Sequence, residues 1–335
     1  MVSVSPNSAL HFPFLTFHFD FELNTSLDLN PNFNRFALAA GLLTLAFAVL
    51  LWRLFTFAIA DELFSYIPLM PFISIYLAWI FKADLPRHGE AKAELGRPSE
   101  SAPARGLAAI FFAAGAAALA GYFVLARTAT PATLANSLAL GTLAWLLGLA
   151  GTGCWCLGGA TMRALAFPFG LLLFMIPFPV GLRDGLETLL QHGSAEVADW
   201  LFVLSGTPVL RTGLEFQLSA ISLQVAPECS GIHSTWVLFI TSLVAGRLIL
   251  RGPGKRALLC LAVLPLALLR NGFRVFVIGQ LCIHVSPRMI DSPIHHRGGP
   301  LFFVLSLAPF FLLLYFLRRS EGAAGGEGGP PTTDH

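Results

Sequence analysis

Cys229 is the residue of this chain best suited to nucleophilic chemistry. It stands in Pro227-Glu228-Cys229-Ser230-Gly231, directly before a long apolar run. Where a helix begins, free backbone N–H groups and a partial positive charge favour a thiolate. Gly231 would let backbone or substrate approach closely, so it is a substrate-binding candidate. A lone cysteine is also commonly a small buried apolar residue, so this stretch alone decides nothing.

A second stretch, Arg270-Asn271-Gly272-Phe273-Arg274, places two guanidinium groups one helical turn apart inside an apolar run. Counting from Arg256 puts Arg270 at ~21 Å and Arg274 at ~27 Å along a hydrocarbon core of roughly 30 Å. Arg274 then lies near the outer interface, at the depth expected for Cys229. A charge inside a span indicates function by default, whereas an arginine at a helix end can simply snorkel to the headgroups.

Arg270 is too deep to snorkel, and we expect it to pair internally. The candidate partners are the carboxylates of Glu187 and Asp291. Arg270 and Asn271 are secondary site candidates.

A third stretch ends in His295-His296-Arg297-Gly298-Gly299, at the mouth of the last apolar run. Adjacent histidines can act as a general acid and base, ligate a metal or simply sit at a wet interface. A zinc site needs more ligands at defined spacings, and only Cys229 and Asp291 could join, so we predict no metal. No cofactor is expected either.

Together the three stretches make a chemically complete set. A thiol, a guanidinium and an imidazole supply a nucleophile, a stabiliser of negative charge and a proton carrier. We therefore take Cys229, Arg274 and one of the two adjacent histidines, His295 or His296, as catalytic candidates.

The composition indicates the kind of fold that must position these residues. Of 335 residues, 55% are hydrophobic and 12% charged, against about 25% charged in soluble domains. Such a chain needs the bilayer as its solvent. We expect an all-α polytopic membrane protein with about eight transmembrane helices. The apolar runs lie near 36–58, 63–81, 107–126, 134–158, 164–182, 232–250, 257–283 and 300–317.

The basic residues predict the orientation of these spans. Lys and Arg concentrate in the 82–106 and 247–256 connections and at Arg318 and Arg319, which the positive-inside rule places in the cytoplasm. Both termini are then cytoplasmic, and segments 183–231 and 284–299 lie outside. The predicted divisions are a cytoplasmic N-terminal segment 1–35, a membrane domain 36–318 and a disordered tail 319–335.

The 183–231 segment is the only sizeable extramembrane piece. Its first part spaces leucines at helical intervals, which predicts a small extracytoplasmic amphipathic helix along the outer surface. Its second part alternates apolar and polar residues on both sides of Ser219-Ala220, which predicts a β-hairpin leading to Cys229. The remaining cysteines are read as packing residues, except that Cys282 could form a disulfide with Cys229 and make it structural.

These stretches resemble the exosortase/archaeosortase family. The resemblance rests on Leu-Gln-Val-Ala-Pro-Glu-Cys229-Ser-Gly-Ile, on the Arg270-to-Arg274 motif and on His295 with the following Gly299-Pro-Leu-Phe-Phe; the run Phe174-Met175-Ile176-Pro177-Phe178-Pro179 adds to it. It covers roughly 60–318. The stretches beginning at Cys229 and Ile294 also resemble the subgroup paired with VPDSG-type tails.

The resemblance implies a membrane cysteine peptidase or transpeptidase of the bacterial inner membrane, with its active site facing the periplasm. Its partners would be exported proteins whose C-terminal tails carry a motif, a hydrophobic span and a basic cluster. The enzyme would cut at the motif and transfer the product to water or to a polysaccharide or lipid acceptor. The spacing to Gly299, itself a substrate-binding candidate, favours His295 over His296. No nucleic-acid partner and no appended second catalytic domain are implied.

Two other classes of function fit the same residues less fully. A transporter or flippase would bind an anionic substrate through Arg270 and Arg274 and leave Cys229 dispensable. A non-catalytic export scaffold would need none of the three catalytic candidates individually. No inverted repeat is visible, which counts against the transporter. Residues 1–35 fit a short strand, an interfacial segment or upstream sequence translated from a misplaced start codon, and are no ordinary signal peptide.

Overall fold

The computed structural model describes residues 31–81, 104–127, 131–219, 221–225, 230–291 and 299–324. Helices dominate it, and one small sheet is present. The elements are α1 (Pro31–Ala46), α2 (Ala48–Ala60), η1 (Glu62–Phe64), η2 (Ile67–Leu69), α3 (Met70–Ile80), α4 (Arg105–Leu125), α5 (Pro131–Cys156), α6 (Gly158–Ala164), α7 (Ala166–Leu171), η5 (Leu172–Met175), α8 (Val180–Leu204), β1 (Val209–Thr212), β2 (Glu215–Leu218), β3 (Ser222–Gln224), α9 (Ile232–Ile249), α10 (Pro253–Leu261), α11 (Val263–His284), η7 (Pro287–Asp291) and α13 (Gly299–Ala324).

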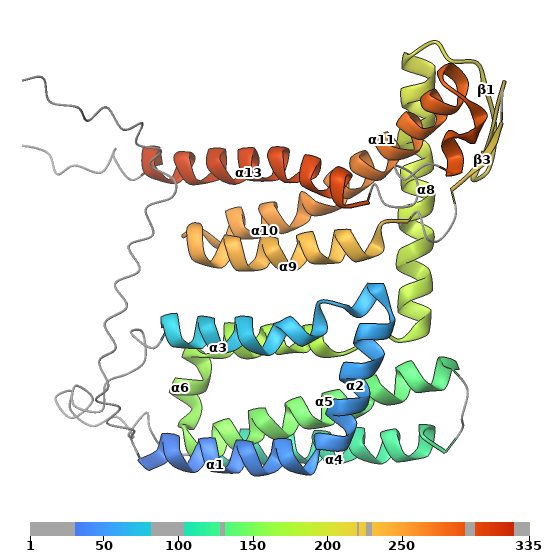
Figure 1. Cartoon of the computed structure of the whole chain (residues 1–335). Helices are drawn as coiled ribbons and strands as arrows, with labels where there is room; N and C mark the ends of the chain where they lie inside the picture. The colour runs from blue at the N-terminus through green and yellow to red at the C-terminus, as the bar shows by residue number, and fades with distance from the viewer. Residues whose placement is uncertain are drawn as a thin grey trace, which may run out of the picture.

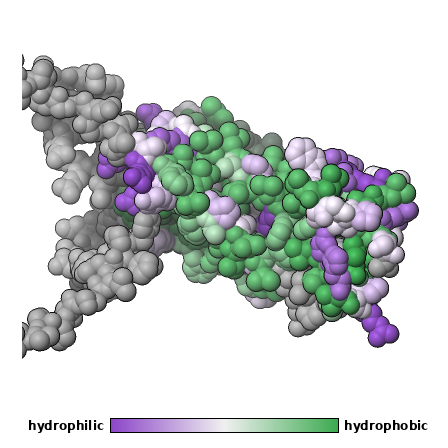
Figure 2. All heavy atoms as spheres, turned by 90° about the horizontal axis from the view of Figure 1, so that it is seen from above, coloured by the Kyte–Doolittle hydropathy of each residue, from purple (hydrophilic) through white to green (hydrophobic). Residues whose placement is uncertain are grey.

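Each of the eight apolar runs falls on helices that can cross a membrane. Six are continuous candidates of 18 to 32 residues, and two are bent pairs, α1 with α2 at 68° and α6 with the α7–η5 segment at 65°. The chain is thus an all-α polytopic membrane protein, with six to eight candidate spans among the described residues. Figure 2 shows the matching surface on one face, with hydrophobic residues across the middle and hydrophilic ones toward both ends.

Prolines explain two of the breaks between helices. Pro168 lacks an N–H and its ring clashes with the carbonyl four residues earlier, which belongs to Ala164, the last residue of α6. Pro265 stands in the same relation to Leu261, the last residue of α10. The bend at Phe47 between α1 and α2 has neither proline nor glycine beside it.

The ends of the helices next to the basic connections 82–106 and 247–256 contact one another and the end of α13, at one end of the bundle. The Glu321 carboxylate of α13 accepts from the N–H groups of Arg251 and Gly252, at the turn between α9 and α10. The Arg247 guanidinium of α9 lies over the ring of Phe81, 4.8 Å from its centre. The α13 helix reaches Ala324, so the first residues of the 319–335 segment predicted to be disordered are helical.

The opposite end carries α8 and the sheet. In Figure 1, α8 runs across the end of α9, and its first residues lie near the end of α5. Its buried stripe comprises Leu190, Gln191, Ser194, Ala195, Ala198 and Phe202. The predicted hairpin is present, with β2 and β3 antiparallel and Phe216 opposite Leu223. A third strand, β1, pairs with β2 and was not predicted.

The sheet is fastened to α8 by apolar packing and by charge. Phe202 of α8, Phe216 of β2 and Cys282 of α11 are all fully buried in one cluster. Arg211 of β1 donates to the Glu196 carboxylate of α8 at 2.7 Å. That hydrogen bond from Arg211 lowers the pKa of Glu196. The sheet and α8 therefore form one extramembrane unit.

The α10–α11 segment is longer than the seventh span predicted for it. Its 32 residues would extend about 48 Å at 1.5 Å per residue, well beyond a hydrocarbon core of ~30 Å. The excess packs on α8, because three glycines let the two helices approach: Gly193 faces Leu268, Gly272 faces Val197 and Gly279 faces Phe202. The second half of α11 thus belongs to the extramembrane unit.

Gly272 is the contact that sets this approach. A Cβ at Gly272 would lie 2.5 Å from the Cβ of Val197 and 2.9 Å from the Ser194 carbonyl oxygen. We expect Gly272→Ala to destabilise the protein by about 1–3 kcal/mol, the usual range for overpacking. Thermal unfolding of the purified protein in detergent would measure the loss.

Gly185 lies in the partner helix α8 and has nothing within 4 Å of an added Cβ, so it provides the matched control. Gly185→Ala should leave the melting temperature unchanged or raise it, since alanine favours helix. Equal effects of the two substitutions would contradict the packing assigned to Gly272.

Candidate active site

The described residues include one catalytic candidate, the residue that follows Cys229, and the residues four positions to either side of His295. Arg274 lies in α11 and is half-buried. Cys229, His295 and His296 lie outside the described residues. Ser230, which follows Cys229, is 1% exposed, and Gly299 begins α13. The geometry of the site is therefore built on the segments that flank Cys229 and His295.

Gly231 begins α9 in a conformation that favours glycine. Its φ is +68° and its ψ 22°, in the left-handed region. Its carbonyl accepts from the N–H and from the hydroxyl of Thr235, and from the hydroxyl of Ser234. A Cβ here would lie against the Asn271 side chain, 2.8 Å from its Cγ. The backbone conformation at position 231 therefore favours glycine independently of any contact with a substrate.

Asn271 connects α11 to the chain just after Cys229. Asn271 is only 3% exposed, and its Nδ2 donates to the Ser230 carbonyl oxygen. Its Oδ1 accepts from Nε of Arg270 at 3.2 Å. Asn271 therefore holds Ser230 and Arg270 at the same time.

Arg270 holds the next residue of the same segment. Its Nη2 donates to the Gly231 carbonyl oxygen and to the Thr235 hydroxyl, each at 3.2 Å. The expected pairing with Glu187 is wrong, because Glu187 instead pairs with Arg183 at 3.1 Å. The side chain of Asp291, the other expected partner, is not among those described. Backbone carbonyls are strong acceptors in every sequence, so hydropathy and charge patterns do not show them.

Arg274 lies one turn further along α11, toward the extramembrane end. It is close enough to Arg270 for the two charges to repel. Gly272, between them, faces α8, which leaves Arg270 and Asn271 turned to α9. The structure thus brings Arg270 and Asn271 against the residues after Cys229, while the depth match expected between Arg274 and Cys229 stays a prediction. For Gly299, nothing lies within 4 Å of an added Cβ, and its substrate-binding role stays a prediction.

His233 and Thr235 were missed by sequence analysis. Nε2 of His233 lies 3.2 Å from the Ser65 hydroxyl, next to Asp61 and Glu62 around η1. Their spacing in the sequence could have indicated them. His233 and Thr235 stand two and four residues after Gly231, on the first turn of the helix that Cys229 precedes. Trp236, which packs edge-on to Phe178 at 4.5 Å, anchors this turn to the chain before α8.

No cluster of three or more His, Cys, Asp or Glu side chains that could hold a metal ion occurs among the described residues. Of the cysteines predicted to be packing residues, Cys154 is buried, whereas Cys156 and Cys260 are half-buried. Cys260 accepts from the Ser242 hydroxyl. Cys282 is fully buried in the α8–sheet cluster.

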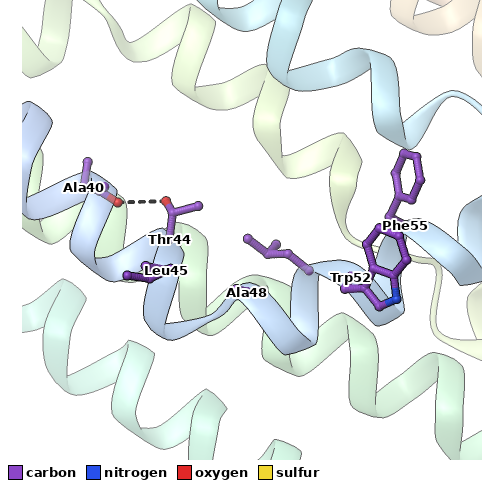
Figure 3. Close-up of a pocket in the computed structure, with 8 residues that line it drawn as sticks. Ala40, Thr44, Leu45, Ala48, Trp52 and Phe55 are labelled. Atoms are coloured by element: carbon purple, nitrogen blue, oxygen red, sulfur yellow. Dashed lines mark hydrogen bonds between the residues drawn. The ribbon is translucent and has the colours of Figure 1, made fainter.

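A groove of about 770 Å³ lies at the bend between α1 and α2, away from these residues. Figure 3 shows Thr44, Trp52 and Phe55 along it, with the Thr44 hydroxyl donating to the Ala40 carbonyl. Its lining is almost wholly apolar, and none of the candidate catalytic residues contributes to it. It fits a lipid-facing surface of the membrane domain.

Gly231 allows a test of the geometry that does not depend on activity. We expect Gly231→Ala to cost more than the ~1–2 kcal/mol of a left-handed non-glycine residue, because the methyl group also meets Asn271. Gly206 has a φ of +67° and nothing within 4 Å, so Gly206→Ala should show the backbone cost alone. Chemical denaturation of both variants would measure the difference, and equal costs would contradict the contact with Asn271.

A family model described as "Transmembrane exosortase" matches residues 52–312. No curated protein and no solved structure matches. The matched range spans most of the chain and includes all three stretches that carry the candidate chemistry. The chain therefore belongs to the transmembrane exosortase family.

Proposed function

We propose that this protein is a membrane cysteine peptidase or transpeptidase that cleaves the C-terminal sorting tails of exported proteins. The observation that carries the proposal is the contact between α11 and the start of α9. Asn271 and Arg270 donate to the carbonyls of Ser230 and Gly231, so the arginine stretch lies against the segment that Cys229 belongs to. Family membership supports a sorting enzyme of this kind.

In the proposed reaction, the substrate's hydrophobic span lies in the bilayer and brings its motif to the outer interface. The Cys229 thiolate attacks the carbonyl carbon of the motif, and the C–N bond breaks to leave a thioester. Arg274 stabilises the negative oxygen formed during attack. His295 protonates the departing amine, then takes a proton from water or an amine acceptor, which attacks the thioester and releases the thiolate.

The edge of the small sheet supplies a place for an extended motif. β3 is an edge strand in the described sheet order β1-β2-β3, and it precedes Cys229 by five residues. Extended peptides commonly bind by adding a strand to such an edge. We propose that tails dock there. The VPDSG-type specificity suggested by the sequence stays a prediction.

Cysteine-dependent processing is the first expectation. A tagged reporter with a motif-span-basic tail, co-expressed with the protein, should be shortened on immunoblots by wild type and left intact by Cys229→Ala. Cys229→Ser should be nearly inert, because serine is not ionised at neutral pH. Arg274→Met and His295→Ala should also abolish shortening, whereas His296→Ala should retain most of it.

Each variant must accumulate in membranes at the wild-type level for this comparison. Cys282→Ser serves as the matched cysteine control and should process the tail normally. Full loss in Cys282→Ser would indicate a structural disulfide and contradict the nucleophile assignment. Equal processing by wild type and Cys229→Ala would overturn the nucleophile assignment.

We further propose that the protein lies in the bacterial inner membrane with the α8–sheet unit in the periplasm and both termini in the cytoplasm. The supporting observations are the basic connections and the placement of α8 opposite the described ends of α1 and α13 (Figure 1). Fusions of alkaline phosphatase in the 127–134 connection should be active, and fusions in 251–256 inactive. The reverse pattern would overturn the proposed polarity.

A further inference from the structure

Arg270 is a buried guanidinium whose described partners all lack charge. The residue is 7% exposed and donates to the Asn271 amide, the Gly231 carbonyl and the Thr235 hydroxyl. Its Nη1 is buried and has no hydrogen-bond partner among the described residues. None of the ion pairs found in the described part of the chain involves it. A buried cation without a counter-charge is costly, so an anion is expected beside it.

The carboxylates around this corner have other partners. Asp61 and Glu187 both face Arg183, at 3.8 and 3.1 Å. Glu62 and Asp61 lie near His233, on the η1 side of α9. On α11 the neighbouring charge is Arg274, which is also positive. The described surroundings of Arg270 therefore leave its charge uncompensated.

The residue directly before Ser230 has a side chain that can ionise. Cys229 precedes Ser230, and neighbouring Cα atoms are about 3.8 Å apart. Ser230 and Gly231 are both held through their carbonyls by Asn271 and Arg270. A thiol next to an arginine and at a helix start loses its proton more readily than a free thiol.

We propose that Arg270 is a positioning residue for Cys229: it fixes the Ser230–Gly231 backbone, and its charge favours the Cys229 thiolate. The inference rests on the proposed function, in which Cys229 is the nucleophile. The two arginines then have different roles. Arg274 acts on the oxygen of the substrate, and Arg270 prepares the nucleophile before the substrate arrives.

The pH dependence of Cys229 alkylation tests this inference without any substrate. The probe is N-ethylmaleimide, which is uncharged, on full-length protein in membrane vesicles with Cys154, Cys156, Cys260 and Cys282 replaced by alanine. The pH midpoint of the reaction rate reports the thiol pKa. We expect a wild-type midpoint below ~8.5, the value of a free cysteine. Arg270→Met should raise it by about one unit, roughly a tenfold loss of thiolate at neutral pH.

Three variants separate charge from packing. Arg270→Lys keeps the charge and should keep most of the lowered midpoint. Thr235→Val removes one hydrogen-bond acceptor without changing the charge and should leave the midpoint in place. Arg256 is the matched control, because it lies in the same α10–α11 segment and donates to a backbone carbonyl, that of Leu250. Arg256→Met should also leave the midpoint in place.

The proposal is overturned if Arg270→Met accumulates normally and titrates like wild type, since a merely structural arginine would behave that way. A wild-type midpoint at the free-cysteine value would overturn it without any variant, should Arg270→Met fail to fold. If tails are processed but the midpoint does not move, only this inference fails. If the midpoint moves but no tail is processed in a Cys229-dependent way, the proposed function fails while the coupling of Arg270 to Cys229 stands.

Discussion

A buried positive charge organises the centre of this molecule. Arg270 lies inside a long apolar helix, where an unsatisfied guanidinium would be costly, and it is satisfied in part by carbonyl and hydroxyl oxygens at the start of α9. Those bonds fix how α11 meets α9. Asn271 extends the connection by one residue, to the carbonyl directly after Cys229. The position of the segment that follows Cys229 is thus tied to the cost of burying one cation.

Glycines make this arrangement sterically accessible. Gly231 turns the chain into α9 with a positive φ and leaves room for Asn271, while Gly272 lets the opposite face of α11 press on α8. An arginine, an asparagine and a glycine in succession therefore serve three contacts at once. Because the second half of α11 continues into the cluster of Phe202 and Phe216, the site sits where the membrane bundle joins the extramembrane unit.

The architecture was largely predictable from sequence because bilayer thickness limits the length of a span. Among the described residues, six continuous helices and two bent helix pairs correspond to the predicted runs. The surface helix and the hairpin followed from their periodicities. The bend at Phe47 was not predictable, because no proline or glycine marks it, whereas Pro168 and Pro265 could have indicated theirs. β1 was missed because its sequence, Val-Leu-Arg-Thr, does not alternate between apolar and polar residues. The Glu187 partner for Arg270 was wrong because sequence shows charges but not the carbonyls that compete for them.

The neighbouring arginines also show why a motif cannot be read as one functional unit. Arg270 and Arg274 share a helix and a charge, yet they differ in burial and in what they reach. Arg270 contacts the backbone that follows Cys229, while Arg274 lies a turn nearer the extramembrane end, where a substrate motif would arrive. Loss of activity at either position would look alike in a processing assay. Only a property of the free enzyme, such as the ionisation of its thiol, can distinguish a residue that prepares the nucleophile from one that acts on the bound substrate.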